Sequence, residues 1–309
     1  MLQQWSKEKI ERYKKLAVTA SVLCSCVLFA VKLFASLATG SLAILSSLID
    51  SLSDIVASLI SFIAVKISLK PASCSYRYGY FKAEHLSALA QAAFLAGSGL
   101  FVMYNGVDRF IHPTLLKQTQ VGIFVMVVSL ILTLFLIVFQ KHVSKHTNSM
   151  AIKADSAHYV SDILTNLSII LSLIVVEVFH ITWFDTLTAF AIAFYLLFYA
   201  FQIALESIDA LMDKELSEEV RQNVLSMIQS ITQIKGVHDL RTRDLGSIYY
   251  FELHIELNGN LSLLEAHQIT ELAEEKIKQA YPKAQVLIHQ DPFGIKEDRL
   301  DDTFENCEV

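Results

Sequence analysis

The chain has 309 residues, 53% of them hydrophobic, and a mean hydropathy of +0.45. This composition is typical of a protein that crosses the membrane several times and carries one small soluble domain. The formal net charge is −6, and residues 213–309 alone hold 19 acidic and 10 basic residues, which argues against nucleic acid as a partner.

Six apolar segments follow one another through the first two thirds of the chain. Each is long enough to cross about 30 Å of hydrocarbon, which takes roughly 20 helical residues. Together they predict a six-helix transmembrane domain over residues 13–208, preceded by a short N-terminal segment, residues 1–12. We expect the helices near residues 16–38, 42–66, 83–107, 119–141, 151–179 and 183–207.

The basic residues near the ends of these segments predict their orientation. They gather in the first fifteen residues and in the loops that follow the second and fourth segments. The loops on the other side contain only two basic residues, Arg109 and Lys117. Both termini are therefore expected in the cytoplasm. A cleaved signal peptide is not expected, because the first apolar run is long enough to span the membrane.

The sequence changes character after Asp209. An amphipathic helix, a strand, an alternating strand, a second helix and a short strand follow, which predicts a compact α+β domain over residues 209–292. The stretch 293–309 is acidic and is expected to be disordered. The predicted elements of the domain are residues 216–232, 236–244, 248–257, 262–280 and 284–290.

Two pairs of ionisable residues interrupt the apolar segments. Asp50 and Asp54 lie in the second segment, and His158 and Asp162 lie in the fifth. Residues four apart share one face of a helix, and charged groups at membrane depth are costly enough to indicate function. Three carboxylates and one imidazole suit a divalent cation. The alternative, hydrogen bonds that pack helices together, explains one Asp more readily than two pairs in separate segments.

Four of the ten histidines fall in the C-terminal domain, at His238, His254, His267 and His289, with Asp291 close behind. Dispersed His and Asp side chains that meet in space can bind zinc. Their spacing alone fits solvent-exposed histidines equally well, so the residues themselves leave both interpretations open.

Three segments, residues 40–54, 78–84 and 155–162, resemble the signatures of the cation diffusion facilitator family, and most of all its bacterial zinc and ferrous-iron efflux pumps. The likeness covers residues 10–292. It implies a homodimeric, proton-coupled antiporter in the lipid of the bacterial inner membrane, with six membrane helices, a ferredoxin-like or metallochaperone-like cytoplasmic domain and no prosthetic group.

The resemblance also implies roles for single residues. The two intramembrane pairs match the family's transport site, and the four histidines with Asp291 match a two-metal site at the dimer interface. Lys82 and Asp213 match a charge interlock between the membrane and cytoplasmic parts of the dimer. Ser, Cys and Tyr in residues 71–80 replace the ligands of a further metal site found in close relatives, so we expect that site to be absent.

The donor set predicts the ions. One imidazole with three carboxylates suits Zn²⁺, Fe²⁺ or Cd²⁺, and we expect Zn²⁺ or Fe²⁺ both as transported and as regulatory ions. The alternative is a membrane-anchored metal sensor or buffer, which needs only the C-terminal histidines and leaves the intramembrane ligands unexplained. An enzyme is not expected, because the sequence offers no nucleophile–base set and no H-E-x-x-H motif.

Overall fold

The computed structural model describes residues 5–39, 42–111, 120–179, 183–246, 248–296 and 298–304. The chain divides into two compact units, Met1–Ile208 and Asp209–Val309. The division falls where the sequence changes from apolar to mixed composition.

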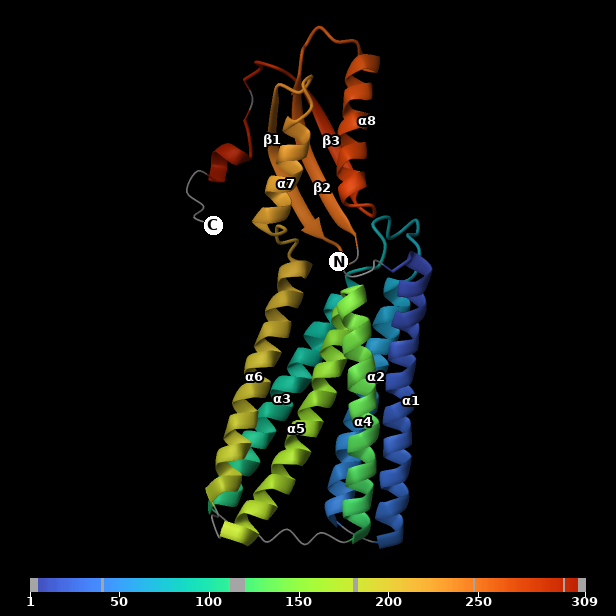
Figure 1. Cartoon of the computed structure of the whole chain (residues 1–309), viewed down its shortest axis with the longest axis vertical. Helices are drawn as coiled ribbons and strands as arrows, with labels where there is room; N and C mark the ends of the chain where they lie inside the picture. The colour runs from blue at the N-terminus through green and yellow to red at the C-terminus, as the bar shows by residue number, and fades with distance from the viewer. Residues whose placement is uncertain are drawn as a thin grey trace. The chain divides into compact units, whose positions relative to one another are not determined.

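Within these described ranges the first unit contains six long helices, coloured from blue to yellow in Figure 1. Their order follows the six apolar segments of the sequence, and α6 runs three residues into the second unit. Five of them hold a described apolar stretch long enough to cross a membrane: α1, α2, α3, α4 and α6. The helices are α1 (Lys7–Thr39), α2 (Leu42–Ser68), α3 (Ala83–Ile111), α4 (Gln120–Thr147), α5 (Met150–Phe179) and α6 (Trp183–Leu211).

Small residues let the helices of this unit approach one another closely. A Cβ atom added at Gly99 of α3 would lie 3.2 Å from Cγ of Leu197, and one added at Gly106 would lie 3.0 Å from Cβ of Ala189. Small side chains at helix contacts are typical of membrane bundles. Among the described residues, five of the eight buried hydrophobic residues that pack between α3, α5 and α6 are alanines: Ala88, Ala92, Ala154, Ala157 and Ala200.

A buried ion pair ties together one end of the bundle. Lys14 of α1 lies 2.9 Å from Oε1 of Glu84, and both residues are buried. The Glu84 carboxylate also accepts hydrogen bonds from Ser68 of α2 and from Ser149 between α4 and α5. Because a buried charge is tolerated only when it is paired and hydrogen-bonded, this carboxylate connects α1, α2 and α3 to the link between α4 and α5.

The link between α4 and α5 is short. Asn148 there adopts a left-handed backbone with φ of 49°, a conformation that Asn tolerates better than most residues. Its amide donates a 2.8 Å hydrogen bond to the carbonyl of Ser144 in the last turn of α4. Helices joined by so short a link lie antiparallel as neighbours, so α4 and α5 form a hairpin.

The second unit has the predicted order of helix, strand, strand, helix, strand, and confirms the expected α+β fold (Figure 1). The sheet order is β1-β2-β3, with β1 antiparallel and β3 parallel to β2. The elements are α7 (Glu218–Gln229), β1 (Gly236–Asp244), β2 (Tyr249–Leu257), α8 (Leu263–Ala280), β3 (Gln285–Pro292) and the 3-10 helix η1 (Asp301–Phe304).

One face of the sheet forms the hydrophobic core. The alternating β2 residues Phe251, Leu253, Ile255 and Leu257 are buried against α7 and α8. Because side chains alternate along a strand, His254 lies on the other, polar face.

Residues 298–304 differ from the disorder that the sequence predicts for this stretch. They include η1, and their backbone and side chains contact β1 and β2 through Arg299 and Asp301.

Candidate metal sites

The intramembrane candidate site joins α2 and α5. The Nε2 atom of His158 lies 2.9 Å from Oδ1 of Asp54, and their exposed fractions are only 6% and 7%. Asp162, one turn further along α5, completes a group whose ligand atoms all lie within 4.8 Å of one another. One imidazole nitrogen and two carboxylate oxygens at this separation can bind one divalent cation.

Asp50, the fourth predicted ligand, has an exposed side chain and is not in this group of described residues. The neighbouring Ser51 accepts a 2.6 Å hydrogen bond from Nζ of Lys32 in α1, and Lys32 is close enough to attract the Asp50 carboxylate. The structure therefore brings together three of the four predicted ligands, and the role of Asp50 stays a prediction.

The sequence interpretation missed a buried polar network beside this site. Asp155 is fully buried, and its Oδ2 atom accepts hydrogen bonds of 2.6 Å from Ser21 of α1 and 2.6 Å from Gln140 of α4. Ser58 of α2 lies 2.9 Å from the Ser21 hydroxyl and 2.8 Å from the hydroxyl of Tyr159. Three neutral side chains and the Asp155 carboxyl thus link α1, α2, α4 and α5.

The network lies about one helical turn from the proposed ligands. Asp155 precedes His158 by three residues on α5, and Ser58 follows Asp54 by four residues on α2. It therefore fixes the two ligand-bearing helices relative to each other. The sequence contained one signal for this network: the helical spacing of Asp155, His158 and Asp162 places all three on one face of α5.

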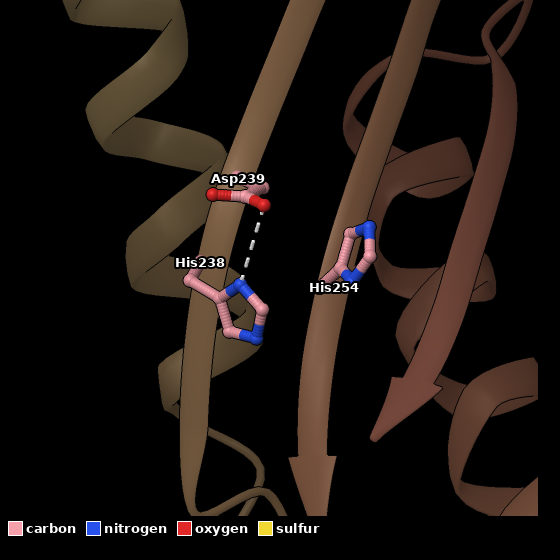
Figure 2. A group of neighbouring side chains, drawn as sticks. All are labelled: His238, Asp239 and His254. Carbon is pink, nitrogen blue, oxygen red and sulfur yellow. Dashed lines mark ion pairs between the residues drawn. The ribbon is translucent and has the colours of Figure 1, made fainter. Parts of the chain in front are cut away.

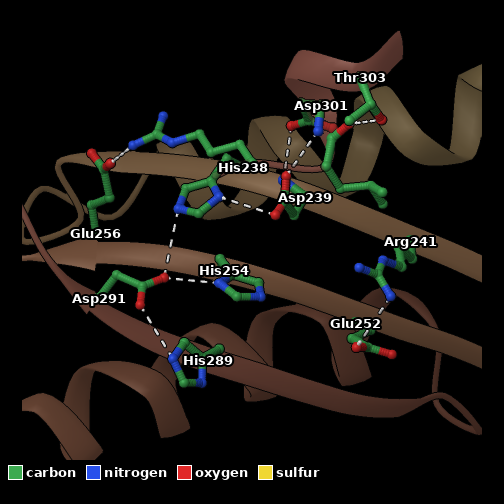
Figure 3. A network of polar contacts seen from close by, with 12 residues as sticks. His238, Asp239, Arg241, Glu252, His254, Glu256, His289, Asp291, Asp301 and Thr303 are labelled. Carbon is green, nitrogen blue, oxygen red and sulfur yellow. Dashed lines mark hydrogen bonds and ion pairs between the residues drawn. The ribbon is translucent and has the colours of Figure 1, made fainter. Parts of the chain in front are cut away.

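In the C-terminal domain, three histidines form a row across the polar face of the sheet. His238 of β1 pairs with His254 of β2, which pairs with His289 of β3. Asp291 joins the row, with its carboxylate 2.8 Å from His254, 3.2 Å from His289 and 3.6 Å from His238, as Figure 3 shows. Imidazole and carboxylate are donors that Zn²⁺ prefers, so this set fits the ion.

Two neighbouring groups in this row have metal-binding geometry. His254, His289 and Asp291 form one group, and His238, Asp239 and His254, drawn in Figure 2, form the other. The ligand atoms of each group lie within 4.8 Å of one another. His254 belongs to both groups. Two adjacent ions thus have a structural basis within a single chain.

Asp239 was not among the predicted ligands. It sits at an irregularity of β1, between His238 and Arg241, with a left-handed φ of 53°. Burial opposes ionisation of its carboxyl. Hydrogen bonds from the backbone amides of Asp301 and Leu300, together with the neighbouring His238, outweigh burial and hold its pKa below the usual value.

The other predicted residues lie apart. His267 of α8 is exposed, 3.5 Å from Glu271, and belongs to neither group among the described residues. Four of the five predicted C-terminal ligands therefore meet in one chain. Lys82 and Asp213 belong to different units, so their interlock stays a prediction; within its own unit Asp213 lies 3.5 Å from Arg243.

Comparisons with known proteins cover both units. Residues 18–212 match the cation efflux transmembrane domain, and residues 216–293 match the cytoplasmic domain of cation efflux proteins. The chain is 42% identical to the cation-efflux pump FieF of Shewanella oneidensis over 282 residues, which cover 91% of this chain and 95% of that protein. It is 38% identical to FieF of Citrobacter koseri over 284 residues, with coverage of 90% and 92%.

Among solved structures, the Zn form of CzrB is 30% identical and covers 28% of this chain and 99% of its own, with a TM-score of 0.26. The metal-bound C-terminal domain of CzcD from Thermotoga maritima is 22% identical and covers 26% of this chain and all of its own, with a TM-score of 0.25.

Proposed function

This chain belongs to the cation efflux family, and on that basis we propose that it is a proton-coupled antiporter exporting divalent transition-metal cations from the cytoplasm. The observation that carries the proposal is the buried contact of 2.9 Å between His158 and Asp54, with Asp162 in the same group. Ionisable side chains of this kind, placed together inside an apolar bundle, form a binding site rather than a surface feature.

Competition between metal and protons supplies the coupling. Metal ligation needs a neutral imidazole and ionised carboxylates, so an ion and protons compete for His158, Asp54 and Asp162. On the cytoplasmic side, where protons are scarcer, the metal binds; on the more acidic outside, protons displace it. A bundle that opens alternately to the two sides then exports metal as protons enter. The donor set favours Zn²⁺, Fe²⁺ or Cd²⁺.

The remaining parts of the proposal concern the assembly. We propose a homodimer in the bacterial inner membrane, with both termini in the cytoplasm and the Lys82–Asp213 interlock between the two parts of the dimer. The C-terminal histidine row binds Zn²⁺ or Fe²⁺ as regulatory ions. His267, exposed on α8, is available to a second copy of the chain.

The decisive experiment measures zinc and iron uptake into proteoliposomes under an imposed pH gradient. Wild type is compared with Asp54→Ala and with the control Asp209→Asn, which alters an exposed ion pair with Lys214. The proposal expects gradient-dependent uptake that Asp54→Ala loses and the control keeps. Absence of uptake by a folded, dimeric wild type would point instead to the membrane-anchored sensor or buffer.

A further inference from the structure

The segment 298–304 docks on the polar face of the sheet beside the histidine row. The backbone amide of Asp301 donates a 3.0 Å hydrogen bond to Oδ1 of Asp239, and the amide of Asp239 donates a 2.8 Å bond to Oδ2 of Asp301. This reciprocal pair is visible in Figure 3. The segment is therefore attached to Asp239, the β1 carboxylate that forms a group with His238 and His254.

A second contact holds the segment on the other side of His238. Arg299 forms an ion pair with the buried carboxylate of Glu256, which pairs across the sheet with Gly236. His238 lies between these two attachments along β1, as Figure 3 shows for the Glu256 and Asp239 contacts. The segment thus contacts the sheet on both sides of His238, a proposed metal ligand.

The irregularity in β1 explains why a contact is needed there. Register with β2 is lost between His238 and Arg241, so the intervening backbone lacks its usual partners on β2. Asp301 accepts the amide of Asp239, and Arg221 donates to the carbonyl of Leu240 at 3.3 Å. Because buried backbone groups need partners, residues 298–304 stabilise the local geometry that turns Asp239 toward His238.

The carboxylate of Asp239 has one oxygen for each task. Its Oδ1 accepts the Asp301 amide, while its Oδ2 lies 3.7 Å from Nδ1 of His238. An ionised carboxylate has lone pairs enough to accept a hydrogen bond on one oxygen and bind a metal with the other. The Asp301 amide therefore bonds Oδ1, and Oδ2 is the oxygen that faces His238.

We propose that Asp239 is a metal ligand together with His238 and His254, and that residues 298–304 are a clasp that holds its carboxylate in position. This inference rests on the proposed role of the histidine row as a metal site. Partners that orient a metal ligand typically change metal affinity 10- to 100-fold, roughly, when they are removed. Coupling is reciprocal, so an ion that binds Asp239 also strengthens the docking of the clasp.

The test uses the full chain in detergent with Asp54→Ala as background, which removes the intramembrane site. Zinc affinity is measured by competition with a chelating dye for Asp301→Ala and for its control Asp302→Ala, which removes the same charge at the next, exposed position of η1. We expect Asp301→Ala to weaken the binding of one zinc ion about 10- to 100-fold and Asp302→Ala to leave it unchanged. Equal affinities in these two variants would overturn the clasp.

Asp239→Asn separates ligation from docking, because the amide oxygen still accepts the Asp301 amide. The variant should bind the same zinc ion more weakly than wild type does. Without zinc, hydrogen exchange of residues 298–304 should stay at the wild-type rate. Zinc should slow that exchange in wild type and not in Asp239→Asn. Wild-type zinc affinity in Asp239→Asn would overturn its assignment as a ligand. If wild type and His254→Ala bound equal amounts of zinc, the histidine row itself would not be a metal site.

Discussion

The Nε2 atom of His158 and the Oδ1 atom of Asp54 lie 2.9 Å apart although 104 positions separate the residues in the chain. The contact joins α2 to α5, and the two residues are almost fully buried. A hydrogen-bonded pair at this separation is close enough for both side chains to ligate one ion after small rotations.

Replacing His158 or Asp162 by alanine should abolish proton-linked metal export while the protein still folds. Each change removes a donor from the intramembrane group but leaves the buried network around Asp155 in place. Uptake into proteoliposomes measures the loss, and gel filtration confirms the folded dimer. Normal export from well-folded variants would refute the assigned role.

His158→Asp should shift the preference of the protein toward Mn²⁺. The change replaces the only nitrogen donor of the group with oxygen, and Mn²⁺ favours oxygen ligands more than Zn²⁺ does. Competitive uptake of the two ions by wild type and variant measures the shift. An unchanged ratio would show that His158 does not set selectivity.

Asp155→Ala should destabilise the membrane bundle more than Asp155→Asn. Alanine leaves the buried donors of Ser21 and Gln140 without their acceptor, at a cost of about 1–3 kcal/mol for each unsatisfied group, whereas asparagine keeps one oxygen acceptor. Thermal unfolding in detergent compares the two variants. Asp209→Ala is the control, because exposed ion pairs contribute little. Equal midpoints for alanine and asparagine would contradict the proposed role of the network.

The first turn of α8 should loosen as the pH falls. The hydroxyl and the backbone amide of Ser262 both donate to the Glu265 carboxylate and hold the pKa of Glu265 below its usual value. A lowered pKa in the folded state means that this contribution is present above the ordinary carboxyl pKa and is lost as the pH falls through the lowered value.

Hydrogen exchange of that turn in the full chain, corrected for the intrinsic pH dependence of exchange, measures the effect. Glu265→Gln is the matched control, because its amide has no charge to lose in this range. Identical pH dependence in wild type and variant would show that the capping carboxylate does not control this turn.

The sequence predicted the elements well because each depends on a local pattern. Long apolar runs indicated the membrane helices, and strict alternation assigned Phe251, Leu253, Ile255 and Leu257 to the core. The four-residue spacings placed His158 and Asp162 on one helix face. The pairing of His158 with Asp54 followed from the cost of isolated charges rather than from any pattern that links α2 to α5.

The parts that escaped prediction depend on tertiary contacts. Ser21, Ser58 and Gln140 are neutral side chains in apolar helices, and nothing in their spacing distinguishes a network from isolated polar residues. Arg299 and Asp301 belong to a charged stretch whose composition predicts disorder.

Asp239 was not among the predicted ligands for a geometric reason. Regular alternation along a strand would place it on the face opposite to His238. The irregularity of β1 and a left-handed backbone bring both side chains into one group.

The short hairpin of α4 and α5 bears on how the chain enters the bilayer. Lys153, Asp155, His158 and Asp162 all lie in the first half of α5. The insertion cost of an acidic residue in a lone helix rises toward the helix centre, where it reaches about 2.5–3.5 kcal/mol. Gln140 of α4 already supplies a partner for Asp155. We therefore expect α5 to insert poorly alone and efficiently behind α4, which glycosylation mapping of the two segments would test. The buried network beside the proposed cargo site then makes α4 a prerequisite for the insertion of α5.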